Sequence, residues 1–147
     1  MVRPRKISKT LSANDTGMNG THQAGILVPK DKEILSFFPT LDATVKNPRA
    51  KISLSDSSGR AWSFSFIHYN NKFFDGTRDE YRLTGMTGFM REIGARVGDK
   101  LVFSRDSAEN YHVELSRERE APVVEVSDEG KRHVKITASS TWKVVAI

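Results

Sequence analysis

One short segment alternates large aromatic residues with serines, and it constrains the fold more than any other feature of the chain. Trp62, Phe64 and Phe66 are each separated by one serine. Successive side chains of a strand point to opposite faces, so this spacing predicts a strand that buries one face. Turn-forming residues separate Ala61–His68 from a second apolar segment, Lys51–Leu54, and we predict that the two form a hairpin. We assign the three aromatic residues, together with Trp142, to the core.

The rest of the chain predicts a mainly β protein with two short helices. Short apolar segments recur between turn residues, at a spacing typical of a barrel or a sandwich. One helix is predicted at Lys32–Phe38, with Asp31 as its N-cap and Pro39 as its stop, and the other at Thr87–Ile93. Ala13–Thr21 is predicted to be a loop. The other predicted strands are Lys6–Ser12, Gly25–Pro29, Glu80–Thr84, Lys100–Ser104, Tyr111–Leu115, Val123–Val126, His133–Ile136 and Trp142–Ala146.

Composition narrows the classes of function. The chain has 147 residues, 37% of them hydrophobic, which suits a single domain spanning 1–147. It lacks cysteine, so disulfides and thiolate metal sites are excluded, and a reducing cytoplasm is expected. No apolar run approaches the roughly 20 residues of a membrane span, and no signal-peptide core follows the basic N-terminus. The net charge of +5 favours a polyanionic partner such as nucleic acid.

The segment 77–82 carries the strongest candidates for nucleic-acid contacts. Arg78, Glu80 and Arg82 are two residues apart, so in a strand they share one face, and Asp79 and Tyr81 share the other. An arginine can contact guanine O6 and N7 together, and a carboxylate can accept from cytosine N4. The row therefore suits a G/C-rich major-groove edge. The alternative is a solvated strand face on which the glutamate bridges its arginine neighbours.

A second candidate segment lies near the N-terminus. Short polar side chains and glycines predict a tight loop whose backbone N–H groups approach phosphates, and Asn14 can also pair with adenine. An ordinary turn closed by polar side chains is the alternative. The candidate contacts in this segment are Ser12, Asn14, Asp15, Thr16 and His22.

Catalytic interpretations find little support in the sequence. The four histidines lack metal-ligand spacing, and neither a phosphate-binding loop nor a dinucleotide fingerprint is present. Asp106 with Glu129 and Lys131 superficially resembles a nuclease cluster, but the latter two fall in a predicted hairpin turn. We therefore expect no enzyme activity from this chain alone, no metal and no cofactor. A small metal-dependent nuclease and a single-strand or RNA binder remain the alternatives from other classes.

Two groups of residues carry a family resemblance. Lys9–Gly17, with Gly20–Gln23 and Gly25–Pro29 after it, closely resembles the N-terminal effector domain of the restriction endonuclease EcoRII. Gly76–Thr84 resembles the second DNA-contacting arm of the same domain. The chain departs from that family at Tyr81, where the EcoRII arm carries a lysine.

A wider pattern resembles the plant B-three transcription-factor domains, which share that fold. Leu83-Thr84 ends a strand, Gly88-Phe89 starts a helix, and Gly98-Asp99 forms a turn before the hairpin Lys100–Leu115. The match covers roughly residues 7–116, which we take as the core of the domain, with C-terminal strands within 122–147.

The resemblance implies a seven-stranded open β-pseudobarrel with two arms that grip the major groove of double-stranded DNA. Thr77 through Arg82 would form one arm, and Ser12 through His22 the other. In the EcoRII family the domain binds an extra copy of the recognition site and controls a separate, C-terminal nuclease domain. The implied setting is a prokaryotic cytoplasm, and 5′-CCWGG is the first target to test. A stand-alone transcription-factor-like domain of the same fold is the alternative.

Overall fold

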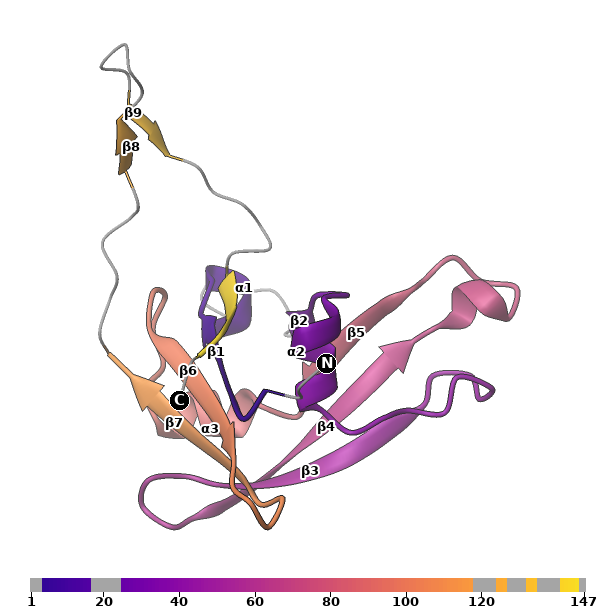
Figure 1. The fold of residues 1–147 in the computed structure, drawn as a ribbon, viewed down its shortest axis with the longest axis horizontal. Helices are drawn as coiled ribbons and strands as arrows, with labels where there is room; N and C mark the ends of the chain where they lie inside the picture. Colours follow the sequence, from indigo (N-terminus) through magenta and orange to yellow (C-terminus); the bar gives the residue numbers. More distant parts are fainter. Residues whose placement is uncertain (1–3, 17–24, 118–123, 127–131, 135–140, 146–147) are drawn as a thin grey trace.

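The computed structural model describes residues 4–16, 25–117, 124–126, 132–134 and 141–145. Eight strands form one sheet, in the order β10-β1-β6-β7-β3-β4-β5-β2 (Figure 1). All neighbouring strands pair antiparallel except β3 and β7, which are parallel. The strands of this sheet are β1 (Lys6–Thr10), β2 (Ile26–Val28), β3 (Arg49–Ser55), β4 (Ala61–Tyr69), β5 (Glu80–Thr84), β6 (Lys100–Arg105), β7 (Tyr111–Ser116) and β10 (Trp142–Val144).

The two edge strands of the sheet, β2 and β10, approach each other closely enough for a side chain to join them. The indole Nε1 of Trp142 on β10 donates a hydrogen bond to the carbonyl oxygen of Leu27 on β2, at 2.9 Å. The sheet therefore curls into a nearly closed barrel whose last gap is bridged by a side chain instead of a backbone ladder. The predicted pseudobarrel class is confirmed, with eight strands in the described sheet instead of seven.

The core fills the inside of this barrel, as the alternation on β4 predicts. Phe64 and Phe66 are buried, and Trp142 joins them. Trp62 is only partly buried and packs edge-on against Phe89, with ring centroids 5.2 Å apart. These four aromatic residues are therefore used for packing, and their rings do not form an exposed stacking platform of the kind that single-strand binders use.

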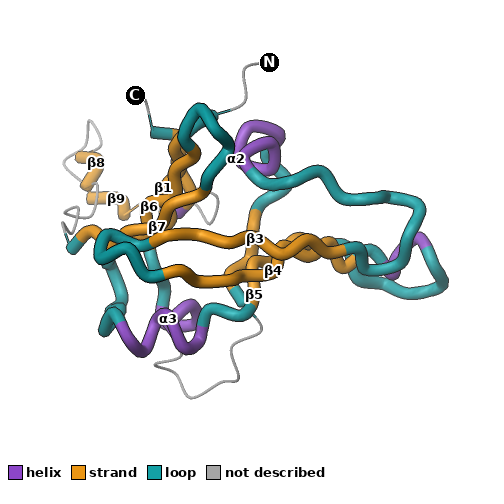
Figure 2. The backbone as a smooth tube through the Cα atoms, turned by 90° about the horizontal axis from the view of Figure 1, so that it is seen from below, coloured by secondary structure: helices purple, strands orange, loops and turns teal. Residues whose placement is uncertain are grey.

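Short helices cover the ends of the barrel (Figures 1 and 2). Helix α2 (Lys32–Phe37) begins at Asp31, whose carboxylate accepts from the backbone N–H groups of Glu33 and Ile34. It ends where Phe38 turns extended before Pro39, because a residue that precedes proline disfavours the helical conformation. Helix α3 (Thr87–Glu92) buries Phe89 and Met90.

Two local features differ from the sequence prediction. Residues predicted as a loop contain a one-turn helix, α1 (Ala13–Thr16). A 3₁₀ turn, η1 (Asn71–Phe73), lies between β4 and β5. The predicted C-terminal hairpin is present as β8 (Val124–Val126) paired with β9 (Arg132–Val134), a separate two-stranded sheet.

Candidate nucleic-acid interface

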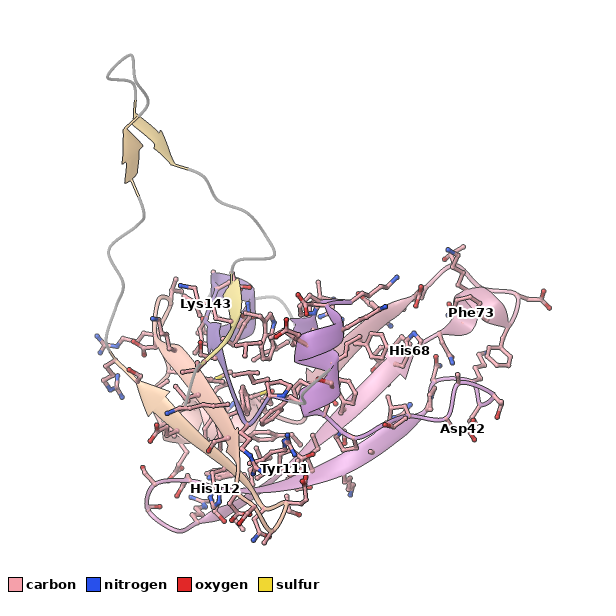
Figure 3. The ribbon with its side chains drawn as sticks, viewed as in Figure 1. Asp42, His68, Phe73, Tyr111, His112 and Lys143 are labelled. Carbon is pink, nitrogen blue, oxygen red and sulfur yellow. The ribbon has the colours of Figure 1, made fainter. Side chains whose placement is uncertain are left out.

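The segment from η1 through β5, which we call the second arm, extends from the barrel at the far end of β4 (Figures 1 and 3). The structure brings Arg78, two residues before β5, together with Glu80 and Arg82 on β5, as their spacing predicts. Glu80 accepts from the guanidinium of Arg78, and its Oε1 lies 3.3 Å from Nε of Arg82. The glutamate thus bridges its two arginine neighbours in one arginine row, an arrangement that the alternative of a solvated strand face also predicts.

Charge interactions keep Glu80 ionised, and a contact with an aromatic ring positions Arg78. Partial burial raises the pKa of the Glu80 carboxyl, but hydrogen bonds from Arg78 and Arg82 outweigh burial and hold that pKa below its ordinary value. The carboxylate is therefore ionised at neutral pH. The Arg78 guanidinium also lies 3.9 Å from the ring centroid of Tyr69, a cation–π contact. Both arginines remain partly exposed, so the row can present N–H donors to a ligand.

The opposite face of β5 has a structural role. Asp79 pairs with His68 and with Lys30, at 2.8 and 2.7 Å, and hydrogen bonds with these two residues hold the pKa of Asp79 below its ordinary value. Tyr81 stacks on His68, with ring centroids 4.0 Å apart, and on Phe66 at 5.7 Å. Asp79 and Tyr81 were predicted as contacts, but their side chains are engaged here, away from the arginine row.

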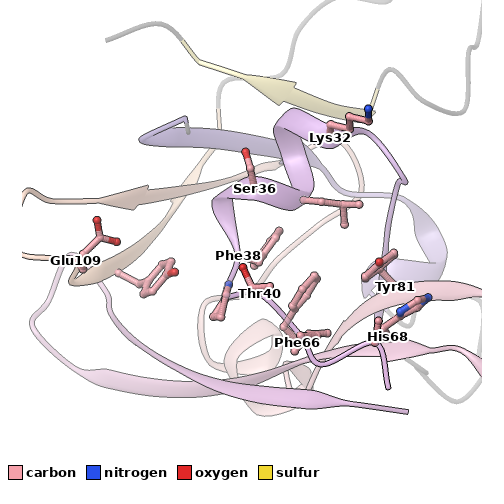
Figure 4. Close-up of a pocket in the computed structure, with 13 residues that line it drawn as sticks. Lys32, Ser36, Phe38, Thr40, Phe66, His68, Tyr81 and Glu109 are labelled. Carbon is pink, nitrogen blue, oxygen red and sulfur yellow. The ribbon is translucent and has the colours of Figure 1, made fainter. Parts of the chain in front are cut away.

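These stacked rings line a pocket of about 810 Å³ between α2 and strands β4 and β5 (Figure 4). Phe38 continues the stack, lying 4.5 Å from Phe66 in a parallel arrangement. Tyr81 therefore supports the arm from its core side, and its phenol belongs to the wall of this pocket.

The turn at the tip of the second arm is held by two asparagines. Asn70 is buried; its side chain accepts from the N–H of Asn47 and donates to the carbonyl oxygen of Val45. Asn71 accepts the backbone N–H of Arg78 at 2.6 Å, and the N–H of Lys72 donates to the Arg78 carbonyl oxygen. The start of β5 and the tip therefore form one unit. Thr77 lies exposed within it.

The first arm begins at α1, where a capping box explains the helix. The Ser12 hydroxyl accepts the N–H of Asp15 at 3.3 Å, and the Asp15 carboxylate accepts the N–H of Ser12 at 2.8 Å. This reciprocal pair is the signal behind the unpredicted helix, since Ser-x-x-Asp is a variant of the capping-box pattern. Thr16 directs its hydroxyl to the backbone carbonyl oxygens of Ser12 and Ala13.

Asp15 was predicted as a DNA contact, and in the structure its side chain points inward, so that role stays a prediction. Its side chain is buried and lies 3.3 Å from Nζ of Lys9. Burial outweighs this pairing and lowers the pKa of Lys9 from its ordinary value. Ser12 remains exposed, whereas the predicted contact His22 and the side chain of Asn14 lie outside the described residues.

Arg82 also contacts Gly25, the residue immediately before β2. The guanidinium Nη1 of Arg82 donates to the Gly25 carbonyl oxygen at 3.1 Å. Gly25 has a φ of +90°, and a Cβ there would lie 2.5 Å from the carbonyl oxygen of Leu83. The contacts of the arginine row therefore extend from Asn71 at the tip of the second arm to the residue before β2.

Two residues that shape this site were not among the sequence candidates: Lys30 and His68, which hold Asp79. His68 follows Phe66 at the period of two, so the continued alternation on β4 could have placed it beside Tyr81. Within the described residues, no three histidine or acidic side chains gather as a metal site, and no described helix is long and apolar enough to span a membrane.

Comparisons with known proteins place this architecture in one fold class. The structure resembles the Arabidopsis FUS3–DNA complex, with a TM-score of 0.58 and 20% identity, covering 75% of this chain and 94% of that one. It also resembles the B3 domain of the UbaLAI restriction endonuclease solved with cognate DNA, with a TM-score of 0.50 and 24% identity, covering 75% and 65% of the two chains. The fold is that of a B3-type pseudobarrel.

Sequence comparison then identifies the family. Residues 5–128 match the model of the family described as restriction endonuclease EcoRII, N-terminal, and the chain belongs to that family. It is 37% identical over 84 residues to the type II restriction enzyme EcoRII of Escherichia coli. This alignment covers 52% of this chain and 19% of that protein. It is 32% identical over 116 residues to auxin response factor 10 of Oryza sativa, covering 78% and 15%. The chain thus spans less than a fifth of these relatives.

Proposed function

We propose that this chain is a sequence-specific reader of double-stranded DNA that places its second arm in the major groove. The observation that carries the proposal is the arginine row at β5, in a chain of the EcoRII N-terminal family. Glu80 brings the guanidinium groups of Arg78 and Arg82 together, and guanine offers two acceptors on one edge that an arginine can contact. The exposed Ser12 of the first arm and the exposed Thr77 of the second are candidate contacts to phosphate or sugar.

Within a whole protein, this reader serves as the effector domain of a type II restriction endonuclease, covalently linked to a C-terminal nuclease domain in a prokaryotic cytoplasm. The similarity to EcoRII supports this role. The matches to auxin response factor 10 and to the B3 domain-containing transcription factor VAL3 of Arabidopsis thaliana support a second candidate, a stand-alone transcription-factor-like module. Both candidates share the duplex-binding site.

A gel-shift panel tests the binding function. Duplexes of different sequence, with 5′-CCWGG first, compete against single strands of the same sequence. We expect the protein to bind one duplex more tightly than the other duplexes and the single strands. Arg82→Ala should then weaken binding to that duplex by about 1–3 kcal/mol, the range for an arginine bidentate to guanine, and should affect nonspecific duplex much less. Arg91→Ala, which removes an exposed arginine on α3, is the matched control and should leave binding unchanged.

The outcomes separate the alternatives. Preference for single strands would overturn the duplex proposal. Incubation with supercoiled plasmid and Mg²⁺ should leave the plasmid intact; metal-dependent nicking that follows the protein through purification would assign a nuclease to the chain itself. Equal loss in the two arginine variants would show that charge alone binds DNA and that β5 does not read bases.

A further inference from the structure

The tip of the second arm exposes apolar side chains that the barrel does not use. Phe73 is 66% exposed and Phe74 is 38% exposed, and Val45, 49% exposed, lies in the loop that Asn70 ties to the same tip. Figure 3 shows Phe73 at the far end of the arm, away from the core. Exposed apolar groups that gather at one place usually mark a binding surface.

The tip is built to hold these rings in place. Buried Asn70 anchors the turn to Asn47, whose N–H it accepts at 2.7 Å. Asp75 has a φ of +68°, a conformation that costs a non-glycine residue free energy. At Gly76 a Cβ would lie 2.5 Å from the Asn71 side chain, so the turn packs too closely to admit one. The exposure of Phe73 is therefore a property of an ordered turn.

The connection of the tip to the arginine row favours DNA over an apolar protein surface as the occupant. Lys72, beside Phe73, is exposed, and so is Lys46 beside Val45; the described part of the chain supplies neither with an ion-pair partner. The same two segments also carry the exposed carboxylates of Asp42 and Asp75, so the tip offers a ligand its apolar side chains and no excess of either charge. The tip also continues the arginine row, because Arg78 is bonded to Asn71 and to Lys72 through its backbone.

We propose that Phe73 reads the C5-methyl group of a pyrimidine in the major groove, next to the base pair contacted by the arginine row. This inference rests on the proposed duplex binding and deepens it. The C5-methyl is the apolar feature that a base presents in the major groove, and a phenylalanine ring contacts it favourably. Thymine carries this methyl, and 5-methylcytosine carries it at the same position, so the two sources share one chemistry.

Replacing single bases in the preferred duplex tests the contact atom by atom. Each thymine is exchanged in turn for deoxyuridine, which removes only the methyl, and each cytosine for 5-methylcytosine, which adds one. Burial of one methyl contributes about 0.8 kcal/mol, or about fourfold in affinity. We expect wild-type binding to weaken about fourfold at one thymine position, or to strengthen about fourfold at one cytosine position.

Three variants assign that response to Phe73. Phe73→Ala should bind more weakly and should no longer respond to the methyl at that position. Phe73→Leu keeps an apolar side chain and should keep part of the response. Val97→Ala removes an exposed apolar side chain outside the arm and should respond as the wild type does. Thermal unfolding should show little change for Phe73→Ala, because the ring is largely exposed.

The inference is overturned if no position responds to the methyl in the wild-type protein, or if Phe73→Ala keeps the full response. Either result would leave the proposed function standing, provided that the wild type still selects one duplex and Arg82→Ala still loses that selection. Failure of duplex selection itself would instead overturn the proposed function on which this contact rests.

Discussion

At the scale of single residues, Glu80 decides how the arginine row behaves. It accepts from Arg78 and lies 3.3 Å from Nε of Arg82, and the lowered pKa keeps it charged. Glu80→Ala removes a negative charge near DNA, so we expect tighter binding to nonspecific duplexes. It also frees two guanidiniums from their common acceptor, so discrimination between the preferred duplex and its single-base variants should fall. Titrations of both classes of duplex, followed by fluorescence anisotropy, measure the two effects.

A matched variant separates geometry from charge. Glu114→Ala removes an exposed carboxylate from β7, outside the second arm, and should leave discrimination unchanged. If Glu80→Ala binds every duplex more tightly with its sequence preference intact, then β5 is not the reader, and the recognition surface moves to Ser12–His22.

At the scale of elements, the pairing of β2 with β5 positions the Gly25 carbonyl oxygen against Arg82. Gly25 adjoins this pair with a φ of +90°, and an added Cβ would meet the backbone of Leu83. Gly25→Ala should therefore destabilise the protein by more than the roughly 1–3 kcal/mol of backbone strain alone, and should displace the carbonyl oxygen that Arg82 uses. Thermal unfolding and duplex affinity should both decrease.

The hairpin turn between β3 and β4 supplies the control. Gly59 has a φ of +88°, but a Cβ there would meet nothing within 4 Å. Gly59→Ala should thus show the strain without the clash, and duplex affinity should stay at the wild-type level. Equal losses of stability in the two variants would mean that β2 and β5 move apart to accommodate the added methyl group. Their spacing would then not determine the position of Arg82.

At the scale of the whole molecule, the charge balance predicts how binding responds to salt. The net charge is +5, and we expect about six phosphate contacts across the two arms. Counterion release then gives a slope of about −5 for log K against log salt concentration. Replacing an arginine that contacts phosphate by alanine should reduce the magnitude of this slope by about one. Replacing an arginine that contacts a base should change the slope little. Binding isotherms over a range of salt concentrations give the slope, and a flat response would argue against a phosphate-lined interface.

Much of the architecture follows from local patterns in the sequence. The aromatic alternation on β4 predicts the core face that Phe64 and Phe66 form, and Asp31 and Pro39 predict the limits of α2. The period of two also predicts that Arg78, Glu80 and Arg82 lie together. Spacing within a strand and the capping of a helix are local, so the sequence alone indicates which side chains share a face and where α2 begins and ends. Helix α1 also has a local cause, its capping box, which the loop prediction overlooked.

Only the tertiary structure decides how these pieces close and which groups they leave for a ligand. The parallel pairing of β3 with β7, and the bond from Trp142 to Leu27 that closes the barrel, join residues far apart in the chain. The same packing turns Asp15 inward and leaves Phe73 exposed at the tip of the arm. A sequence pattern states which side chains share a face, but burial depends on what the rest of the chain places against that face.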